Sequence, residues 1–282
     1  MSNTQLFIII VFAALIVIGI ALYFFARSIF DKAKAEFTTR TLVLIPIAIA
    51  INIAIGELVG RLKLPIYLDS IGTVLVGALA GPWAGMVTGA LANLIWGFIT
   101  PVSAPFFYVA AVIGIIAGYA GRAGAFEKES PRWLSVLVGA VFFFSLTLFV
   151  LAFINVSTDQ GFATYPSMRE LLSRYTVYFV LAVVIGAAVG YFLIQKGGYA
   201  GLWGLATGIV AAIISAPTAA YVFGGVTGSG TDLLVAAFRA SGGNILASVM
   251  AQGAVSDPFD KMLSYMVVWL ILRSLPSRFK AR

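Results

Sequence analysis

The chain has 282 residues, of which 61% are hydrophobic and 10% are charged. Soluble domains carry roughly 25% charged residues, so this composition excludes an ordinary water-soluble fold and predicts a membrane protein. Cysteine and histidine are absent, which excludes disulfides, zinc–thiolate sites and Ser-His-Asp catalysis. The net charge of +7 comes from Lys and Arg residues in short connections between apolar segments. That pattern is typical of membrane topology signals and not of nucleic-acid binding.

Apolar segments of helical length recur along the whole chain, and together they predict an all-α fold: a polytopic membrane helical bundle. Residues 6–26 are uncharged and no signal-peptide cleavage site follows them, so we expect a retained helix there. Residues 66–80 are too short to cross upright and predict a tilted helix that ends at the Gly81-Pro82 turn. We expect about eight membrane-spanning helices. The first is 6–26, and the others are 42–60, 83–99, 104–120, 133–154, 175–194, 199–223 and 259–275.

The polar connections are expected to differ in role. Residues 155–173 form the longest one, and we expect either a functional loop or a plain connector. In 231–258 two weakly apolar pieces, 232–240 and 244–253, are each too short to cross, which favours a re-entrant or interfacial arrangement.

Charged residues at the start of the last span allow two interpretations. Asp257, Asp260 and Lys261 are close in sequence, and a solvated ion pair at the membrane boundary is the simpler prediction. Alternatively, Lys261 with Arg174 and Arg239 would attract an anionic ligand.

The distribution of Lys and Arg predicts a multi-pass protein of the cell membrane with its N-terminus outside and its C-terminus cytoplasmic. Most of these residues fall in the segments expected inside, which are 27–40, 121–132, 196–198 and the tail from Arg273. We expect three parts along the chain, namely 1–40 (N-terminal helix and linker), 41–195 (a helical core) and 196–282 (C-terminal helices).

Polar side chains around the first Gly-rich hairpin form the best candidate substrate site, because such groups in a bilayer need a partner or a cavity. Trp96 and Tyr108 would stack on a flat ligand while Asn93 fixes its orientation. The competing interpretation pairs Glu57 with Arg61 and makes Trp96 an interfacial anchor. The full candidate set is Asn52, Glu57, Asp69, Asn93, Trp96 and Tyr108.

Small residues four apart recur in several predicted helices, and most such pairs should serve packing between helices of the bundle. Gly85 with Gly89 and Gly204 with Gly208 are examples. The run IAIAINIAIGELVG could instead present Ala50 and Ala54 to a separate membrane subunit.

Residues 66–97, IYLDSIGTVLVGALAGPWAGMVTGALANLIWG, resemble the substrate-binding membrane component (S component) of energy-coupling factor transporters. S components likewise have an acidic residue at the start of a Gly-rich hairpin, Gly-Pro-Trp at its turn and a following helix rich in Gly and Asn. The resemblance covers about residues 41–195. S components usually have six helices, so helix 6–26 and the residues after about 196 depart from the pattern.

The resemblance implies a bundle that binds a micronutrient, typically a vitamin or its precursor, from the outer side. A membrane scaffold subunit and a cytoplasmic ATPase pair would energise release inward, and Ala50 with Ala54 would meet the scaffold. This agrees with the lack of a nucleotide-binding loop, since GVTGSGT has Thr231 where the Walker pattern requires Lys.

We therefore expect a substrate-binding subunit for uptake of a small, vitamin-like micronutrient. No enzyme activity, catalytic residue, cofactor or metal site is predicted. The alternatives are a ligand-binding membrane sensor or receptor, a self-sufficient secondary transporter, and an intramembrane enzyme acting on lipid. In the last case Glu57 and Asp69 would have to act as acid and base.

Overall fold

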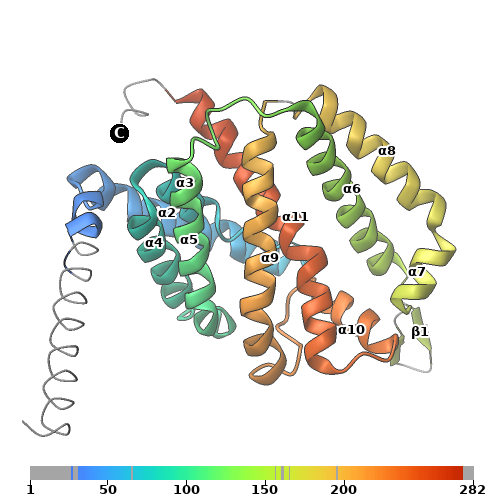
Figure 1. The fold of residues 1–282 in the computed structure, drawn as a ribbon. Helices are drawn as coiled ribbons and strands as arrows, with labels where there is room; N and C mark the ends of the chain where they lie inside the picture. Colours follow the sequence, from blue (N-terminus) through green and yellow to red (C-terminus); the bar gives the residue numbers. More distant parts are fainter. Residues whose placement is uncertain are drawn as a thin grey trace, which may run out of the picture.

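A computed structural model describes residue 27 and residues 31–64, 66–155, 157–159, 162–164, 166–194 and 196–275. These residues are almost entirely helical, as predicted (Figure 1). The predicted helix at 6–26 lies outside them. The helices are α2 (Thr39–Arg61), α3 (Ile71–Ala80), α4 (Pro82–Trp96), the 3₁₀ helix η1 (Pro101–Phe106), α5 (Phe107–Arg122), α6 (Arg132–Ile154), α7 (Met168–Arg174), α8 (Thr176–Phe192), α9 (Gly198–Tyr221), α10 (Asp232–Ala240) and α11 (Ile245–Ser274).

The predicted polar connection 155–173 contains a small antiparallel hairpin followed by α7. Its strands are β1 (Ser157–Asp159) and β2 (Phe162–Thr164), with Ser157 opposite Thr164. Helix α7 then leads directly into α8, and the two helices are bent by 77° relative to each other.

The protein is a multi-pass membrane protein by the length and hydropathy of its helices. In the described part, four helices are long and apolar enough to span a bilayer: α2, η1 with α5, α6 and α9. The bent pair α7 and α8 makes a fifth if it counts as one span. This is fewer than the sequence predicted. Helix α4 has 15 residues and rises only about 22 Å, and α11 carries three charged side chains in its middle.

The last helix differs most from prediction. The piece at 244–253 and the span at 259–275 were expected to be separate, but α11 runs without interruption from Ile245 to Ser274. Pro258 lies inside it, although proline removes a backbone N–H and favours a break. Tertiary packing overrides that tendency here, because Gly208 of α9 lies directly against the backbone of Pro258.

Glycines set the close approach of three helix pairs, in agreement with the packing predicted from their spacing. Gly85 of α4 meets Gly114 of α5, and Gly139 of α6 meets Gly186 of α8. Gly208 serves the same purpose between α9 and α11. A Cβ atom at any of these positions would overlap the backbone of the neighbouring helix.

One apolar core joins α3 and α5 to the two long C-terminal helices, α9 and α11. Val74, Ile113, Ala200 and Val268 are each almost fully buried in it. In Figure 1 α9 lies between α5 and α6, and it packs on both of them and on α11. The C-terminal helices therefore belong to the centre of the bundle, whereas the predicted three-part division of the chain stays a prediction.

The Gly81-Pro82 turn between α3 and α4 is fixed by a buried carboxylate from outside the hairpin. Glu36, just before α2, accepts hydrogen bonds from the backbone N–H groups of Trp83 (2.8 Å) and Ala84 (2.9 Å) at the start of α4. Arg122, at the end of α5, pairs with the same carboxylate at 2.6 Å. Gly81 has φ = 122°, and a Cβ there would also strike the Glu36 carboxylate. Burial raises the pKa of Glu36, because desolvation outweighs these three donors.

We predict that Glu36→Ala lowers the free energy of unfolding by about 1–3 kcal/mol, because it leaves two helix N–H donors and Arg122 without their acceptor. Thermal or denaturant unfolding of the purified protein in detergent measures this. Asp31→Ala removes a neighbouring exposed carboxylate and should change stability by less than about 0.5 kcal/mol. Equal effects of the two substitutions would contradict the anchoring role of Glu36.

Candidate functional site

A cavity of about 590 Å³ lies at the end of the bundle where α2, α4 and α9 end. Its walls come from these helices, from η1, α5, α10 and α11, and from the segment 62–70 before α3, of which the structure describes residues 62–64 and 66–70 as irregular. The volume is within the range of about 300–1,000 Å³ that is usual for small-molecule sites. Irregular backbone inside a membrane protein is expected where it is buried in protein or lines a cavity, and the half-buried residues Ile66, Tyr67 and Asp69 line this one.

The cavity brings together four of the six residues that the sequence proposed as a substrate site. Glu57 comes from the last turn of α2, Asp69 from segment 62–70, and Asn93 and Trp96 from the end of α4. Ala50 and Ala54 do not line the cavity and are exposed on the outside of α2.

Asn52 is the first correction to the predicted site, because its side chain faces α3 and not the cavity. It is buried, donates to the Thr73 hydroxyl (2.8 Å) and accepts from the N–H of Gly72 (2.7 Å). Five residues separate it from Glu57, which turns the two side chains about 140° apart on the helix. The role of Asn52 is therefore to join α2 to α3.

Tyr108 is the second correction. Its hydroxyl donates to the backbone carbonyl of Ile214 (2.9 Å) and hydrogen-bonds to the Thr218 hydroxyl (2.7 Å), so it ties α5 to α9 and does not line the cavity. Phe106, two residues earlier, is the aromatic residue of this segment that lines the cavity, together with Tyr67 and Trp96 from elsewhere. The sequence placed the aromatic wall on the right segment but on the wrong side chain.

Glu57 holds Trp96 in place at the cavity. Its carboxylate accepts from the indole N–H of Trp96 (2.8 Å) and from the Thr100 hydroxyl (2.8 Å), and pairs with Arg61 at 2.8 Å. The i, i+4 pair with Arg61 is the one that the competing interpretation predicted. It coexists with the cavity, since the second carboxylate oxygen of Glu57 orients the tryptophan that forms a wall.

The charged residues of α11 overturn the prediction of a solvated boundary pair. Asp257, Asp260 and Lys261 are 6%, 0% and 4% exposed, respectively. Asp257 and Lys261 line the cavity, whereas Arg174 and Arg239, the suggested companions of Lys261, do not. Three ionisable residues within five positions of an apolar helix were the signal for this site, because charges inside a membrane protein usually mark function.

Asp260 and Lys261 attach α11 to the segment before α3. One carboxylate oxygen of Asp260 accepts from the N–H groups of Tyr67 (3.0 Å) and Leu68 (2.8 Å), which holds Leu68 in the left-handed region at φ = 49°. Lys261 contacts the other oxygen of Asp260 at 2.5 Å and Asp69 at 3.2 Å. The cavity floor thus contains an ammonium group shared between two carboxylates.

The Gly-rich loop between α9 and α10 lies against segment 62–70 beside the cavity. The Tyr67 and Thr231 hydroxyls are 2.8 Å apart, and Lys63 contacts the backbone carbonyl of Gly228. Asp232 fixes the loop by accepting from the N–H groups of Thr227 (3.1 Å) and Gly228 (2.8 Å). The loop is therefore part of the cavity wall.

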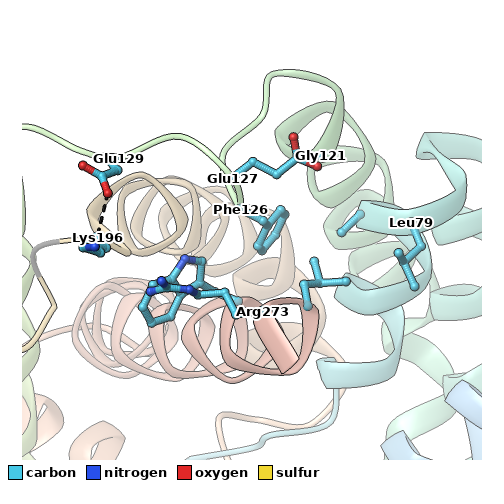
Figure 2. Close-up of a pocket in the computed structure, with 10 residues that line it drawn as sticks. Leu79, Gly121, Phe126, Glu127, Glu129, Lys196 and Arg273 are labelled. Atoms are coloured by element: carbon cyan, nitrogen blue, oxygen red, sulfur yellow. Dashed lines mark ion pairs between the residues drawn. The ribbon is translucent and has the colours of Figure 1, made fainter. Parts of the chain in front are cut away.

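A second, smaller hollow of about 270 Å³ lies at the opposite end of the bundle (Figure 2). Phe126 and Leu79 line its apolar side, and Glu129 pairs with Lys196 at 3.4 Å beside it. Those two side chains are largely exposed, so the pair contributes little binding energy. The hollow is also smaller than usual ligand sites, and the larger cavity is the better candidate.

Known proteins give no match to this chain. No family model matches it, and no curated protein or solved structure is significantly similar to it. The likeness of residues 66–97 to S components therefore depends on their motif alone, and the geometry of the cavity carries the functional argument.

We predict that Lys261→Met lowers the free energy of unfolding by about 3–5 kcal/mol, because it leaves the buried Asp260 and the half-buried Asp69 without their counter-ion. Combining it with Asp260→Asn should recover part of the loss. Denaturant unfolding in detergent measures both. Lys196→Met breaks an exposed pair and should cost less than about 1 kcal/mol. A Lys261→Met protein as stable as Lys196→Met would show that the buried cluster is not formed.

Proposed function

We propose that the protein is the membrane-embedded substrate-binding subunit of an uptake system for a small, vitamin-like micronutrient, energised by a separate scaffold subunit and a cytoplasmic ATPase pair. The observation that carries the proposal is the 590 Å³ cavity, which gathers Asp69, Asn93 and Trp96 from the motif shared with S components. A pocket with apolar walls and a few converging polar groups is typical of small-molecule recognition.

The proposed orientation puts the cavity on the outer side, the N-terminus outside and the C-terminus in the cytoplasm of a cell-membrane protein. Two features support it. The described residues 31–40 and 121–132, which hold several Lys and Arg residues, lie at the end of the bundle opposite the cavity, as the positive-inside rule requires of cytoplasmic segments. An uptake subunit must also meet its substrate on the outer side.

The outer face of α2 is the proposed contact with the scaffold subunit. Ala50 and Ala54 are exposed, lie four residues apart and so share one face of the helix. Large apolar residues, including Ile47 and Leu58, are exposed next to them on α2. Small residues within an apolar surface allow the close approach of another membrane helix.

The arrangement favours binding over catalysis. Glu57 and Asp69, the acid and base that a lipid-acting enzyme would need, already have partners. Glu57 is held by Arg61, Trp96 and Thr100, and Asp69 by Lys261. A general base must be free to take a proton from a substrate within hydrogen-bond reach, so these two carboxylates fit better as structural and binding groups.

Gently purified protein should carry a small molecule that native mass spectrometry detects. Because Trp96 forms a wall of the cavity, Trp96→Ala should lower the bound fraction by about tenfold or more. Ile213→Ala, on the exposed face of α9, should leave it unchanged. A small molecule retained equally in both variants would lie elsewhere, and the cavity would not be the site.

The partner prediction separates a transporter subunit from a sensor. Affinity purification of the intact protein should recover a membrane scaffold and ATPase activity, and Ala54→Phe should reduce that activity by about tenfold or more. Val184→Phe, at an exposed position of α8, is the matched control. Ligand binding without any recovered ATPase would favour the sensor, and uptake by vesicles that contain this chain alone would contradict the proposal.

A further inference from the structure

We propose that the ligand of the cavity carries a positive charge, as an organic ammonium or a cationic aromatic nitrogen, and that the carboxylate of Asp257 binds it. The inference depends on the proposed function, because it specifies the charge of the molecule that the binding subunit takes. It rests on the balance of charge in the buried cluster, on the bonding of Asp257 and on the aromatic walls.

The cluster around Lys261 contains more carboxyl groups than cationic groups. Asp69, Asp257 and Asp260 contribute three carboxylates, and Lys261 is the ammonium that contacts two of them. Asp257, one helical turn before Lys261, makes no ion pair among the residues that the structure describes. Ionised carboxylates inside an apolar bundle are costly unless a positive group compensates them.

Asp257 differs from the other charged groups around the cavity. Glu57 pairs with Arg61, Asp69 pairs with Lys261, and Asp232 accepts backbone N–H groups of the Gly-rich loop. Within the described residues, the carboxylate of Asp257 has one hydrogen bond, from the hydroxyl of Ser256 at 3.1 Å. It is 6% exposed and lines the cavity, so a ligand that fills the cavity reaches it away from bulk water.

The walls suit the same class of ligand. Tyr67, Trp96 and Phe106 line the cavity, and aromatic faces attract ammonium groups and stack on flat rings. The Lys261 ammonium already lies 5.8 Å from the centre of the Tyr67 ring. A ligand with a cationic centre and a flat ring would use both features.

An anionic ligand fits less well. Lys261 is the positive group on the cavity floor, and it is engaged by Asp69 and Asp260. Lys63 contacts a backbone carbonyl of the Gly-rich loop, and Arg61 is paired with Glu57. A negative group on the ligand would therefore meet the excess of carboxyl groups and would have to compete for cations that are already engaged.

Three probes of similar size and different charge test the proposal on the purified full chain at pH 7. Benzylamine is cationic, benzyl alcohol is neutral and benzoate is anionic. Calorimetry or ligand-observed NMR gives their affinities. We expect benzylamine to bind at least about tenfold more tightly than benzyl alcohol, and benzoate to bind most weakly.

Asp257→Asn keeps the shape of the side chain and removes its charge. It should reduce the advantage of benzylamine over benzyl alcohol to less than about threefold, because the neutral probe does not use the carboxylate charge. Glu170→Gln removes an exposed carboxylate of α7, outside the cavity, and should leave all three affinities unchanged. The three-probe comparison on the unaltered protein tests the proposal even where Asp257→Asn fails to fold.

The outcomes distinguish this inference from the function on which it rests. If benzyl alcohol or benzoate binds as tightly as benzylamine, or if folded Asp257→Asn keeps the full preference, the positive-charge proposal is overturned and a binding subunit remains. If no probe binds and no small molecule co-purifies, the proposed function is overturned, and the inference with it.

Discussion

The buried Lys261 ammonium joins two parts of the chain that lie 192 residues apart. It contacts Asp69 and Asp260, while Asp260 also accepts the N–H groups of Tyr67 and Leu68. This cluster holds the backbone of Tyr67 and Leu68 in a non-helical path beside the cavity, and α3 begins only at Ile71. The cavity depends on that path, because Ile66, Tyr67 and Asp69 form part of its wall. The charges that make the bundle costly to assemble therefore also shape the wall of the cavity.

The opposite end of the first hairpin is fixed in a comparable way by Glu36, which binds the start of α4 and Arg122 of α5. Between these two polar anchors the helices pack through glycines, which bring backbones into contact without polar groups. The bundle therefore combines two fixed ends with a closely packed middle. Three further polar residues at the cavity end, Asn93, Trp96 and Asp257, line the cavity. Each also makes a hydrogen bond within the protein, so each combines a structural contact with access to the cavity.

The helical class, the Gly81-Pro82 turn and a gathering of polar side chains at the first hairpin could be predicted from sequence, since they follow from apolar segment lengths and from the cost of polar groups in a bilayer. The use of that cavity as a substrate site stays a prediction. Side-chain direction could not. Asn52 and Tyr108 have the right chemistry for a ligand site, yet each bonds to a neighbouring helix. The continuity of α11 through Pro258 was also beyond local rules, because contact with α9 decides it. Burial of Asp257 and Lys261 had a signal in the sequence, a charge cluster in an apolar helix, but the pairing of Lys261 with Asp69, 192 residues away, matches neither of the two interpretations that the sequence offered.

The central claim, a water-accessible recess within the bundle, is tested most directly by the reactivity of single cysteines, because the sequence contains no native cysteine. Ser215 lines the cavity, and Ile213, two residues away on α9, is exposed on its outer face. In intact cells or oriented vesicles, Ser215→Cys should react with a membrane-impermeant maleimide added from outside, whereas Ile213→Cys, facing lipid, should not. Protection of Ser215→Cys, or equal reaction at both positions, would contradict the account.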